Sequence, residues 1–326
     1  MQPVFVTGVG SWPGTDITDA CQIVFDVAQH LPFLPELPER GYGADTIGRT
    51  MALVMQADAN FAIRTTASGW QLDGSIGRDS RRAMSYLERD IDVMHETFSD
   101  YEGDFKVQVV GPWTLAASVE LATGQKILGD IGATRDLSAA LVEATRAHVV
   151  DVQTRLPKAN VVLQCDEPML AKVQYGAVPT ASGWHRYHSV EAHVLTSVLT
   201  DLITGHGGAA SIVHDCSSDF VFEALKMPGL GWSLDISILG SQHFDLIGEH
   251  IESGGFLVLG IDFTSQRQAI AKIKELGSSI GYSVTDWARS IGVSPTCGLA
   301  HMSVSDARKK IEFLNTIARA MHEELE

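Results

Sequence analysis

The chain has 326 residues, of which 45% are hydrophobic and 20% are charged, so it can bury a sizeable core and is not expected to be disordered. Its net charge of −16 argues against nucleic acid and anionic membrane surfaces as partners, because both are bound through basic patches. The first residues carry no cationic stretch ahead of an apolar run, and no apolar run reaches about 18 residues, so we expect a cytoplasmic protein without a membrane span.

Short apolar runs rich in Val, Ile and Phe recur along the whole chain. Eight of them are predicted to be β-strands, at residues 4–9, 33–37, 105–110, 160–166, 211–216, 231–236, 256–262 and 292–297. Each run is almost continuously apolar, as expected for parallel strands that are covered on both faces.

Amphipathic helices are predicted between these strands. Apolar residues recur at spacings of three or four within 84–98 and again within 311–321, and Ser303 or Ser305 could cap the second of these helices. Segments 40–80 and 171–187 have no clear period, and they are interpreted as loops over one end of the molecule.

Eight strands, most of them followed by a helix, fit a single (β/α)8 TIM barrel, an α/β fold with a typical length of about 250 residues or more. No linker rich in Gly, Pro or Ser divides the chain, so residues 1–326 are predicted to form one domain. The alternative is a doubly wound open sheet. It is disfavoured because no G-x-G-x-x-G sequence opens a helix after the first strand.

Polar residues gather where the predicted strands end, which is where barrel enzymes place their catalytic groups. His214 and Cys216 lie two apart on one strand, so their side chains share a face. Asp235 ends the next strand and Cys297 ends the last one, and imidazole, thiolate and carboxylate groups are the ligands of zinc. A zinc site is one interpretation of these four residues, and buried free thiols beside a hydrogen-bonded histidine are the other.

Two further features are a pair of adjacent carboxylates and two isolated cysteines. Asp166 and Glu167 follow another predicted strand, where adjacent carboxylates can bind an ammonium group or cap a turn. Cys165 and Cys21 are predicted to be core thiols, because widely spaced cysteines in a chain of this size are not typical of a disulfide framework.

Four short motifs occur along the chain. They are Val-Gly-Ser-Trp-Pro at 9–13, Gln-Cys-Asp-Glu-Pro at 164–168, His-Asp-Cys at 214–216 and Ser-Pro-Thr-Cys-Gly-Leu at 294–299. Their sequences and their order resemble the catalytic C-terminal barrel of the cobalamin-independent methionine synthase family. Longer members of that family carry a second, N-terminal barrel, so the resemblance implies a short member that consists of the catalytic barrel alone.

The resemblance implies a zinc-dependent enzyme that methylates the thiol of homocysteine to form methionine. The zinc ligands of the family correspond to His214, Cys216, Cys297 and Asp235, where Asp235 replaces a glutamate. The homocysteine contacts correspond to Val9, Ser11, Glu36 and Asp166, of which Asp166 would pair with the amino group. Glu39 is an alternative to Glu36 at its position.

The residues that would handle the methyl donor depart from the family. Ser118 stands where folate-using members have a tryptophan that stacks on the pterin, and Thr264 stands where they have a histidine proposed as an acid. Asp262 is predicted to replace that histidine in part as a catalytic acid. The expected donor is methyl-tetrahydrofolate or a methylated corrinoid such as methylcobalamin, the latter delivered by a corrinoid protein partner.

Other classes of protein remain as alternatives. A zinc-thiolate alkyltransferase similar to coenzyme M transferases would use the same ligands on another thiol. A porphyrinogen-decarboxylase-like barrel without metal would follow if His214, Cys216 and Cys297 were not clustered. A zinc hydrolase is disfavoured because two thiolates make the metal less electrophilic, and a closed structural zinc site would indicate a binding protein.

Overall fold

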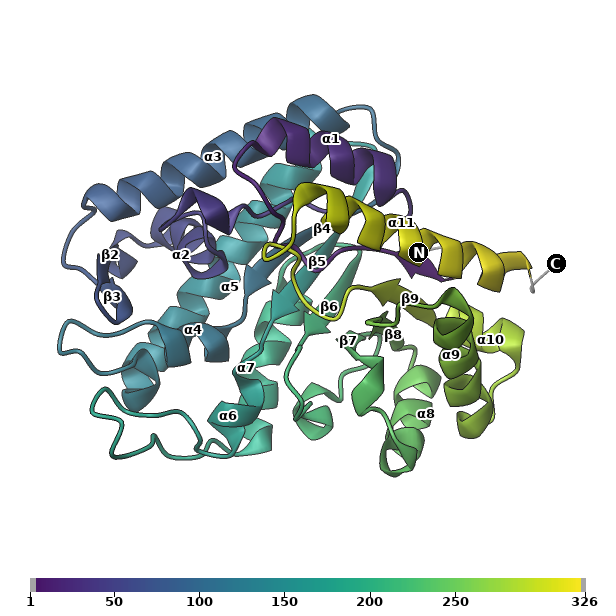
Figure 1. Ribbon diagram of the computed structural model, residues 1–326. Helices are drawn as coiled ribbons and strands as arrows, with labels where there is room; N and C mark the ends of the chain where they lie inside the picture. The colour runs from purple at the N-terminus through teal and green to yellow at the C-terminus, as the bar shows by residue number, and fades with distance from the viewer. Residues whose placement is uncertain (1–3, 324–326) are drawn as a thin grey trace.

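A parallel β-sheet of seven strands forms the centre of the molecule. The computed structural model describes residues 4–323, and the strands of this sheet follow one another in the order β1-β9-β8-β7-β6-β5-β4. Figure 1 shows these strands arranged in a curve. The bounds are β1 Phe5–Val6, β4 Gly103–Val110, β5 Ala159–Asp166, β6 Ala210–His214, β7 Gly231–Asp235, β8 Phe256–Gly260 and β9 Ile291–Ser294. The corresponding predicted strands are confirmed, with ends that differ by a few residues.

The segment at 33–37 lies between the two edge strands of this sheet. It is not a regular strand, and that part of the prediction is wrong. Its first residue forms a single bridge with Lys106 on β4, and Glu36 forms another with Ser11, just after β1. Pro35 lies between the two bridges and has no N–H to donate, which interrupts the ladder. The segment still fills the eighth position, and the predicted (β/α)8 TIM barrel is confirmed as the fold.

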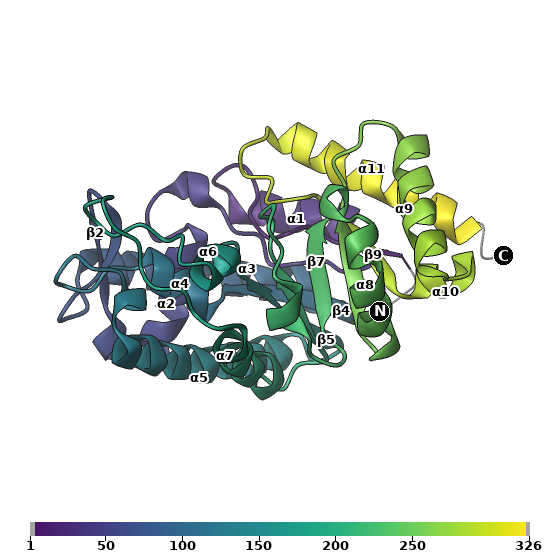
Figure 2. The same ribbon diagram turned by 90° about the horizontal axis from the view of Figure 1, so that it is seen from below.

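Helices cover the outer face of the sheet, as Figures 1 and 2 show. The α-helices are α1 Ile17–Val27, α2 Thr46–Ala57, α3 Arg78–Phe98, α4 Pro112–Ser118, α5 Ile131–Arg155, α6 Leu170–Gln174, α7 Ala192–Gly205, α8 Phe244–Glu252, α9 Gln266–Ile280, α10 Val284–Arg289 and α11 Val304–Glu323. Short 3-10 helices are η1 Pro38–Arg40, η2 Ala59–Phe61, η3 Ile127–Gly129, η4 Phe222–Leu225, η5 Ile236–Ile238 and η6 Ser241–His243.

The two predicted helical patterns fall in α3 and α11. Ser303 caps α11, because its hydroxyl oxygen accepts a hydrogen bond from the backbone N–H of Asp306 at 3.2 Å. Among residues 4–323, no helix combines the length and the apolar character that a membrane span requires.

The segment at 40–80 contains regular structure that its sequence pattern did not reveal. Helix α2 is buried on nearly every side from Gly48 to Met55, so it lacks the polar face that makes a helical period visible. An antiparallel hairpin follows, formed by β2 Ile63–Thr66 and β3 Gly69–Leu72. The segment at 171–187 begins inside α6 and continues as a loop, as predicted for most of its length.

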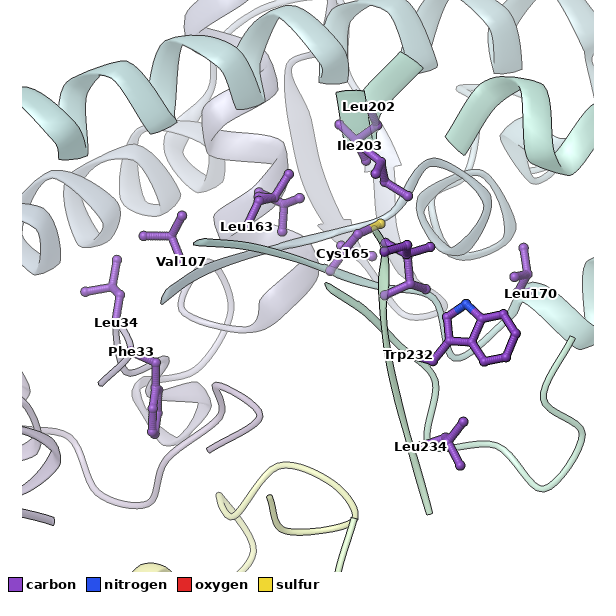
Figure 3. Packing of buried hydrophobic residues seen from close by; sticks show 14 of the residues in the cluster. Phe33, Leu34, Val107, Leu163, Cys165, Leu170, Leu202, Ile203, Trp232 and Leu234 are labelled. Carbon is purple, nitrogen blue, oxygen red and sulfur yellow. The ribbon is translucent and has the colours of Figure 1, made fainter. Parts of the chain in front are cut away.

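The core is apolar and closely packed between the sheet and the outer helices. Figure 3 shows Cys165 of β5 beside Leu202 and Ile203 of α7, with Trp232 of β7 in the same layer. Cys165 and Cys21 are both completely buried, which agrees with their predicted role as core thiols.

Glu167 ties the end of β5 to the start of α4. Its carboxylate accepts hydrogen bonds from the backbone N–H groups of Trp113, at 3.0 Å, and Thr114, at 2.8 Å. The hydroxyl of Thr114 donates a third, at 2.6 Å. Of the two roles considered for this carboxylate, the structure assigns it that of a cap, and it fixes the neighbouring ends of β4 and β5 relative to each other.

Gly111→Ala tests this connection. The new methyl group would overlap the carboxylate of Glu167, so we expect the free energy of unfolding to fall by about 1–3 kcal/mol. Urea unfolding followed by circular dichroism measures the change. Gly74→Ala is the control, because no atom lies within 4 Å of the methyl group added there. Equal stability of the two variants would contradict the packing described for Glu167.

Candidate metal centre and substrate residues

Three of the four predicted metal ligands come together at the ends of their strands. His214 is the last residue of β6, Cys216 follows two residues later, and Cys297 follows β9. One ligand atom from each residue lies within 4.8 Å of the other two. Strands β6 and β9 are separated by β7 and β8 in the sheet, so the curvature of the barrel brings these residues together. This cluster is the candidate metal site, which is called the metal centre below.

The ring of His214 is oriented as in a metal site. Its Nδ1 atom lies 3.0 Å from the hydroxyl oxygen of Ser233, on the neighbouring strand β7. Its Nε2 atom is buried and has no hydrogen-bond partner within residues 4–323. A buried nitrogen without a partner is unfavourable, and a metal ion would satisfy it. In a ligating histidine the other ring nitrogen normally makes a hydrogen bond that holds the orientation of the ring, as Nδ1 does here. The donor set therefore fits a zinc ion bound through Nε2.

The two sulfur atoms of the cluster share a hydrogen bond. Sγ of Cys216 and Sγ of Cys297 lie 3.3 Å apart. This hydrogen bond, together with the nearby imidazole of His214, lowers the pKa of Cys297 to about 4. The same contact raises the pKa of Cys216. The contact therefore favours the thiolate form of Cys297 over that of Cys216, and a bound cation would allow both sulfurs to be thiolates.

Asp235, the fourth predicted ligand, lies beside the cluster but not in it. Its carboxylate accepts a hydrogen bond from the backbone N–H of Ser237 at 2.7 Å, and so it caps η5. His214 pairs with Ser233 across β6 and β7, which places Asp235 level with Cys216, two residues further along each strand. The backbone therefore brings Asp235 next to the cluster, while its side chain points to η5.

Asp262, the predicted catalytic acid, is not brought into the cluster. It follows β8, and its side chain is 81% exposed. Its carboxylate oxygen lies 3.3 Å from Nζ of Lys310 on α11. The structure thus places Asp262 in an exposed ion pair with a neighbouring helix.

Asp166 lies next to the metal centre. It is the last residue of β5, and it pairs with His214 across β5 and β6. Only 9% of its surface is exposed, and burial raises the pKa of its carboxyl group, against the opposing charges of His214 and Lys106. A buried carboxylate beside the metal centre is well placed to receive a cationic group of a ligand.

Lys106, which no sequence motif indicated, connects Asp166 to the loop after β1. Its Nζ atom is fully buried and donates to the carbonyl oxygens of Gly8, at 2.6 Å, and Val9, at 3.0 Å, and to the side chain of Gln164. Gln164 in turn donates to Val9 O and to Asp166, both at 2.7 Å. Burial lowers the pKa of Lys106 to about 7. A lysine among the apolar residues of the predicted strand 105–110, where Gln108 is the only other polar residue, was the signal that could have revealed it.

Ser11 lies against the loop that carries Cys297. Its carbonyl oxygen accepts a hydrogen bond from the backbone N–H of Leu299 at 2.8 Å. Gly298 allows this approach, because a methyl group at its position would lie 2.7 Å from Cβ of Ser11. The predicted substrate loop and the last of the predicted metal ligands are therefore neighbours.

Glu36 lies on the other side of Ser11, at the bridge that closes the barrel. Its carboxylate is buried, with Oε1 3.7 Å from Nε of Arg49, while Oε2 has no hydrogen-bond partner in the described part of the chain. Burial raises the pKa of Glu36 to about 7, and the charge of Arg49 opposes this rise. Glu39, the alternative considered for this position, is exposed in η1. The structure therefore favours Glu36 as the buried acidic group.

Comparison with known proteins agrees with this arrangement. The family model described as the catalytic domain of cobalamin-independent synthases matches residues 4–320. The structure of a B12-independent methionine synthase from Shewanella sp. W3-18-1, solved in complex with selenomethionine, is similar with a TM-score of 0.54. The two sequences are 12% identical, and the similarity covers 99% of each chain, which supports the fold. No curated protein matches the sequence. Since the family model covers almost the whole chain, this protein belongs to the family of cobalamin-independent synthase catalytic domains.

Proposed function

We propose that this protein transfers a methyl group to the thiol of homocysteine and so forms methionine. The observation that carries the proposal is the cluster of His214, Cys216 and Cys297, whose ligand atoms lie within 4.8 Å of one another beside the buried carboxylate of Asp166. A metal-binding group next to a site for a cationic group suits a ligand that carries both a thiol and an ammonium group. Membership of the family supports the same reaction.

His214, Cys216 and Cys297 would hold zinc, and we propose Asp235 as a fourth ligand once its side chain leaves Ser237. A free thiol has a pKa of about 8.5 and is mostly protonated at neutral pH. Zinc, when bound, would supply the positive charge that keeps the substrate sulfur deprotonated and nucleophilic. Ser233 holds the ring of His214 in place for this role.

The protein's own residues would orient the amino-acid part of the substrate. Asp166 would accept hydrogen bonds from the ammonium group, and Glu36 offers a second carboxylate with an oxygen that has no protein partner. Lys106 and Gln164 hold Val9 and Asp166 in fixed relation, so the amino acid would meet a rigid surface. Such positioning lines the sulfur up with the methyl group and lowers the entropic part of the barrier.

We propose methyl-tetrahydrofolate as the methyl donor. A family of cobalamin-independent enzymes does not support the alternative of a methylated corrinoid, nor the corrinoid protein partner that would deliver it. We do not assign protonation of the donor to Asp262, because its carboxylate is exposed and paired with Lys310.

The rival classes are less compatible with the site. The metal-free barrel required that the three ligand residues be apart, and they are clustered. A thiol with a sulfonate and no ammonium group, as in coenzyme M, would meet the negative charges of Asp166 and Glu36, which are both buried. A closed structural zinc site would not need a buried carboxylate beside it.

Cys216→Ser and Cys297→Ser are each expected to abolish stoichiometric zinc binding. The barrel should stay folded, because neither side chain belongs to its buried core. Elemental analysis measures the zinc content, and circular dichroism checks the fold. Cys21→Ser is the matched control, because this thiol is buried in α1 away from the cluster, and it should retain about one zinc per chain. A full equivalent of zinc in both cluster variants would exclude the ligand assignment.

Asp235→Asn is expected to weaken zinc binding, because an amide is a poorer ligand than a carboxylate, while it can still cap η5. Competition with a chromogenic chelator compares the zinc affinity of the variant with that of the wild type. Asp262→Asn is the control and should leave the affinity unchanged. Identical affinities of all three proteins would remove Asp235 from the ligand set.

Asp166→Asn is expected to weaken homocysteine binding by about 1.5–3 kcal/mol, because a charge-assisted hydrogen bond to the ammonium group is lost. Isothermal titration calorimetry of the zinc-loaded protein measures the binding free energy, and zinc content should not change. An unchanged affinity for homocysteine would show that Asp166 does not receive the ammonium group.

A further inference from the structure

A buried set of ionic groups reaches Glu36 from outside the barrel. Arg49 on α2 is 4% exposed, and Asp90 on α3 is completely buried. Arg40, at the end of η1, completes the set with a side chain that is 8% exposed. Charged side chains are seldom buried unless they are paired, so a set of this size inside a small region requires an explanation.

Asp90 is the centre of this set. Arg40 donates two parallel hydrogen bonds to it, from Nη1 to Oδ1 at 2.7 Å and from Nη2 to Oδ2 at 2.6 Å. Nη1 of Arg49 donates to Oδ2 of the same carboxylate. Two guanidinium groups therefore share one carboxylate, which leaves one positive charge in excess. Glu36, 3.7 Å from Nε of Arg49, supplies the negative charge that balances it.

The two oxygens of Glu36 have different surroundings. Oε1 faces Arg49, whereas Oε2 is buried without any hydrogen-bond partner in residues 4–323. A buried carboxylate oxygen that no protein group satisfies is costly, and a ligand with N–H donors would satisfy it. Glu36 bridges to Ser11, and the charges of Asp166 and Lys106 act on it, so this carboxylate belongs to the substrate side of the barrel.

We propose that Arg49 is a positioning residue for substrate recognition. Asp90 holds Arg49 in place, and Arg49 in turn orients the carboxylate of Glu36 toward the ammonium group of the amino-acid substrate. The identity of the ligand rests on the proposed function, whereas the contact between Arg49 and Glu36 is independent of that function. Arg40 acts one step further away, because it touches Asp90 and forms no ion pair with Glu36 among the described residues.

The charges around Glu36 agree with this role. Burial raises the pKa of Glu36 to about 7, and Arg49 is the strongest influence that opposes the rise. Asp166 on β5 raises the pKa further, while Lys106 and the side chain of Gln108, both on β4, lower it. Without Arg49 the pKa would rise above neutral pH, and Glu36 would become a neutral acid that attracts an ammonium group far less.

Arg49→Met tests the link directly, and Arg40→Met is the matched control. Both variants remove one buried guanidinium group from Asp90, but only the first removes the neighbour of Glu36. The ionisation of Glu36 can be followed by carbon-13 NMR of protein labelled at the glutamate carboxyl carbons, with the signal assigned by its loss in Glu36→Gln. We expect a rise of about one pH unit or more in the midpoint for Arg49→Met and a much smaller change for Arg40→Met.

Arg49→Lys provides a second variant if Arg49→Met does not fold. It keeps the positive charge but loses the planar fork of the guanidinium group. We expect the midpoint of Glu36 to stay close to that of the wild type in this variant. A midpoint that does not move in Arg49→Met, or that moves equally in Arg40→Met, would overturn the proposal.

The second readout is selectivity for the ammonium group. Calorimetry compares homocysteine with 4-sulfanylbutanoate, which has the same thiol and carboxylate but no amino group. For Arg49→Met we expect about a tenfold loss of affinity for homocysteine, no loss for 4-sulfanylbutanoate, and recovery as the pH rises through the new pKa of Glu36. Equal losses for both thiols would refute the positioning role.

These measurements separate the inference from the function on which it rests. If the wild-type protein bound neither thiol, the proposed function would fail, and the NMR midpoints would still decide whether Arg49 controls Glu36. If homocysteine bound normally and the midpoints were equal, the role of Arg49 alone would fail.

Discussion

Closure of the barrel by the irregular segment around Pro35 is the constraint on which the site depends. Backbone hydrogen bonds join this segment to both edges of the sheet, from Leu34 N to Lys106 O at 3.0 Å and from Trp12 N to Glu36 O at 2.7 Å. Without them β1 and β4 would be the free edges of an open sheet. Closure places the loop after β1 beside the strands that carry the carboxylate and the metal ligands, so residues from distant parts of the sequence share one end of the barrel.

The interior of this end contains several buried charged side chains, and two of them are held by three hydrogen bonds each. Lys106 is satisfied by three acceptors, and Glu167 by three donors, so their burial costs less than that of isolated charges. Several buried polar atoms have no hydrogen-bond partner in residues 4–323, and Nε2 of His214 and Oε2 of Glu36 are the two that belong to residues of the predicted site. A buried polar atom without a partner is unfavourable, and at this site a bound ligand would supply the missing partner.

The sequence could predict those features that follow from a regular period. His214 and Cys216 still contribute to one cluster, although β6 ends at His214, because the ends of parallel strands meet on one side of a barrel. At the last residue of a strand and beyond it, the period alone no longer determines the direction of a side chain. Asp235 turns to cap η5, and Asp262 pairs with α11, for reasons that no local pattern contains. The ion set around Asp90 was missed because its members come from separate helices.

The hydroxyl group of Ser233 has a consequence for the electronic character of the site. Ligating histidines are often hydrogen-bonded to a carboxylate, which makes the imidazole a stronger electron donor. Here the partner of His214 is a neutral alcohol, so the ring would donate less electron density to a metal than a histidine held by a carboxylate does. A metal ion held by such a histidine would accept more electron density from a further ligand, such as the thiol of the proposed substrate, than one held by a histidine paired with a carboxylate.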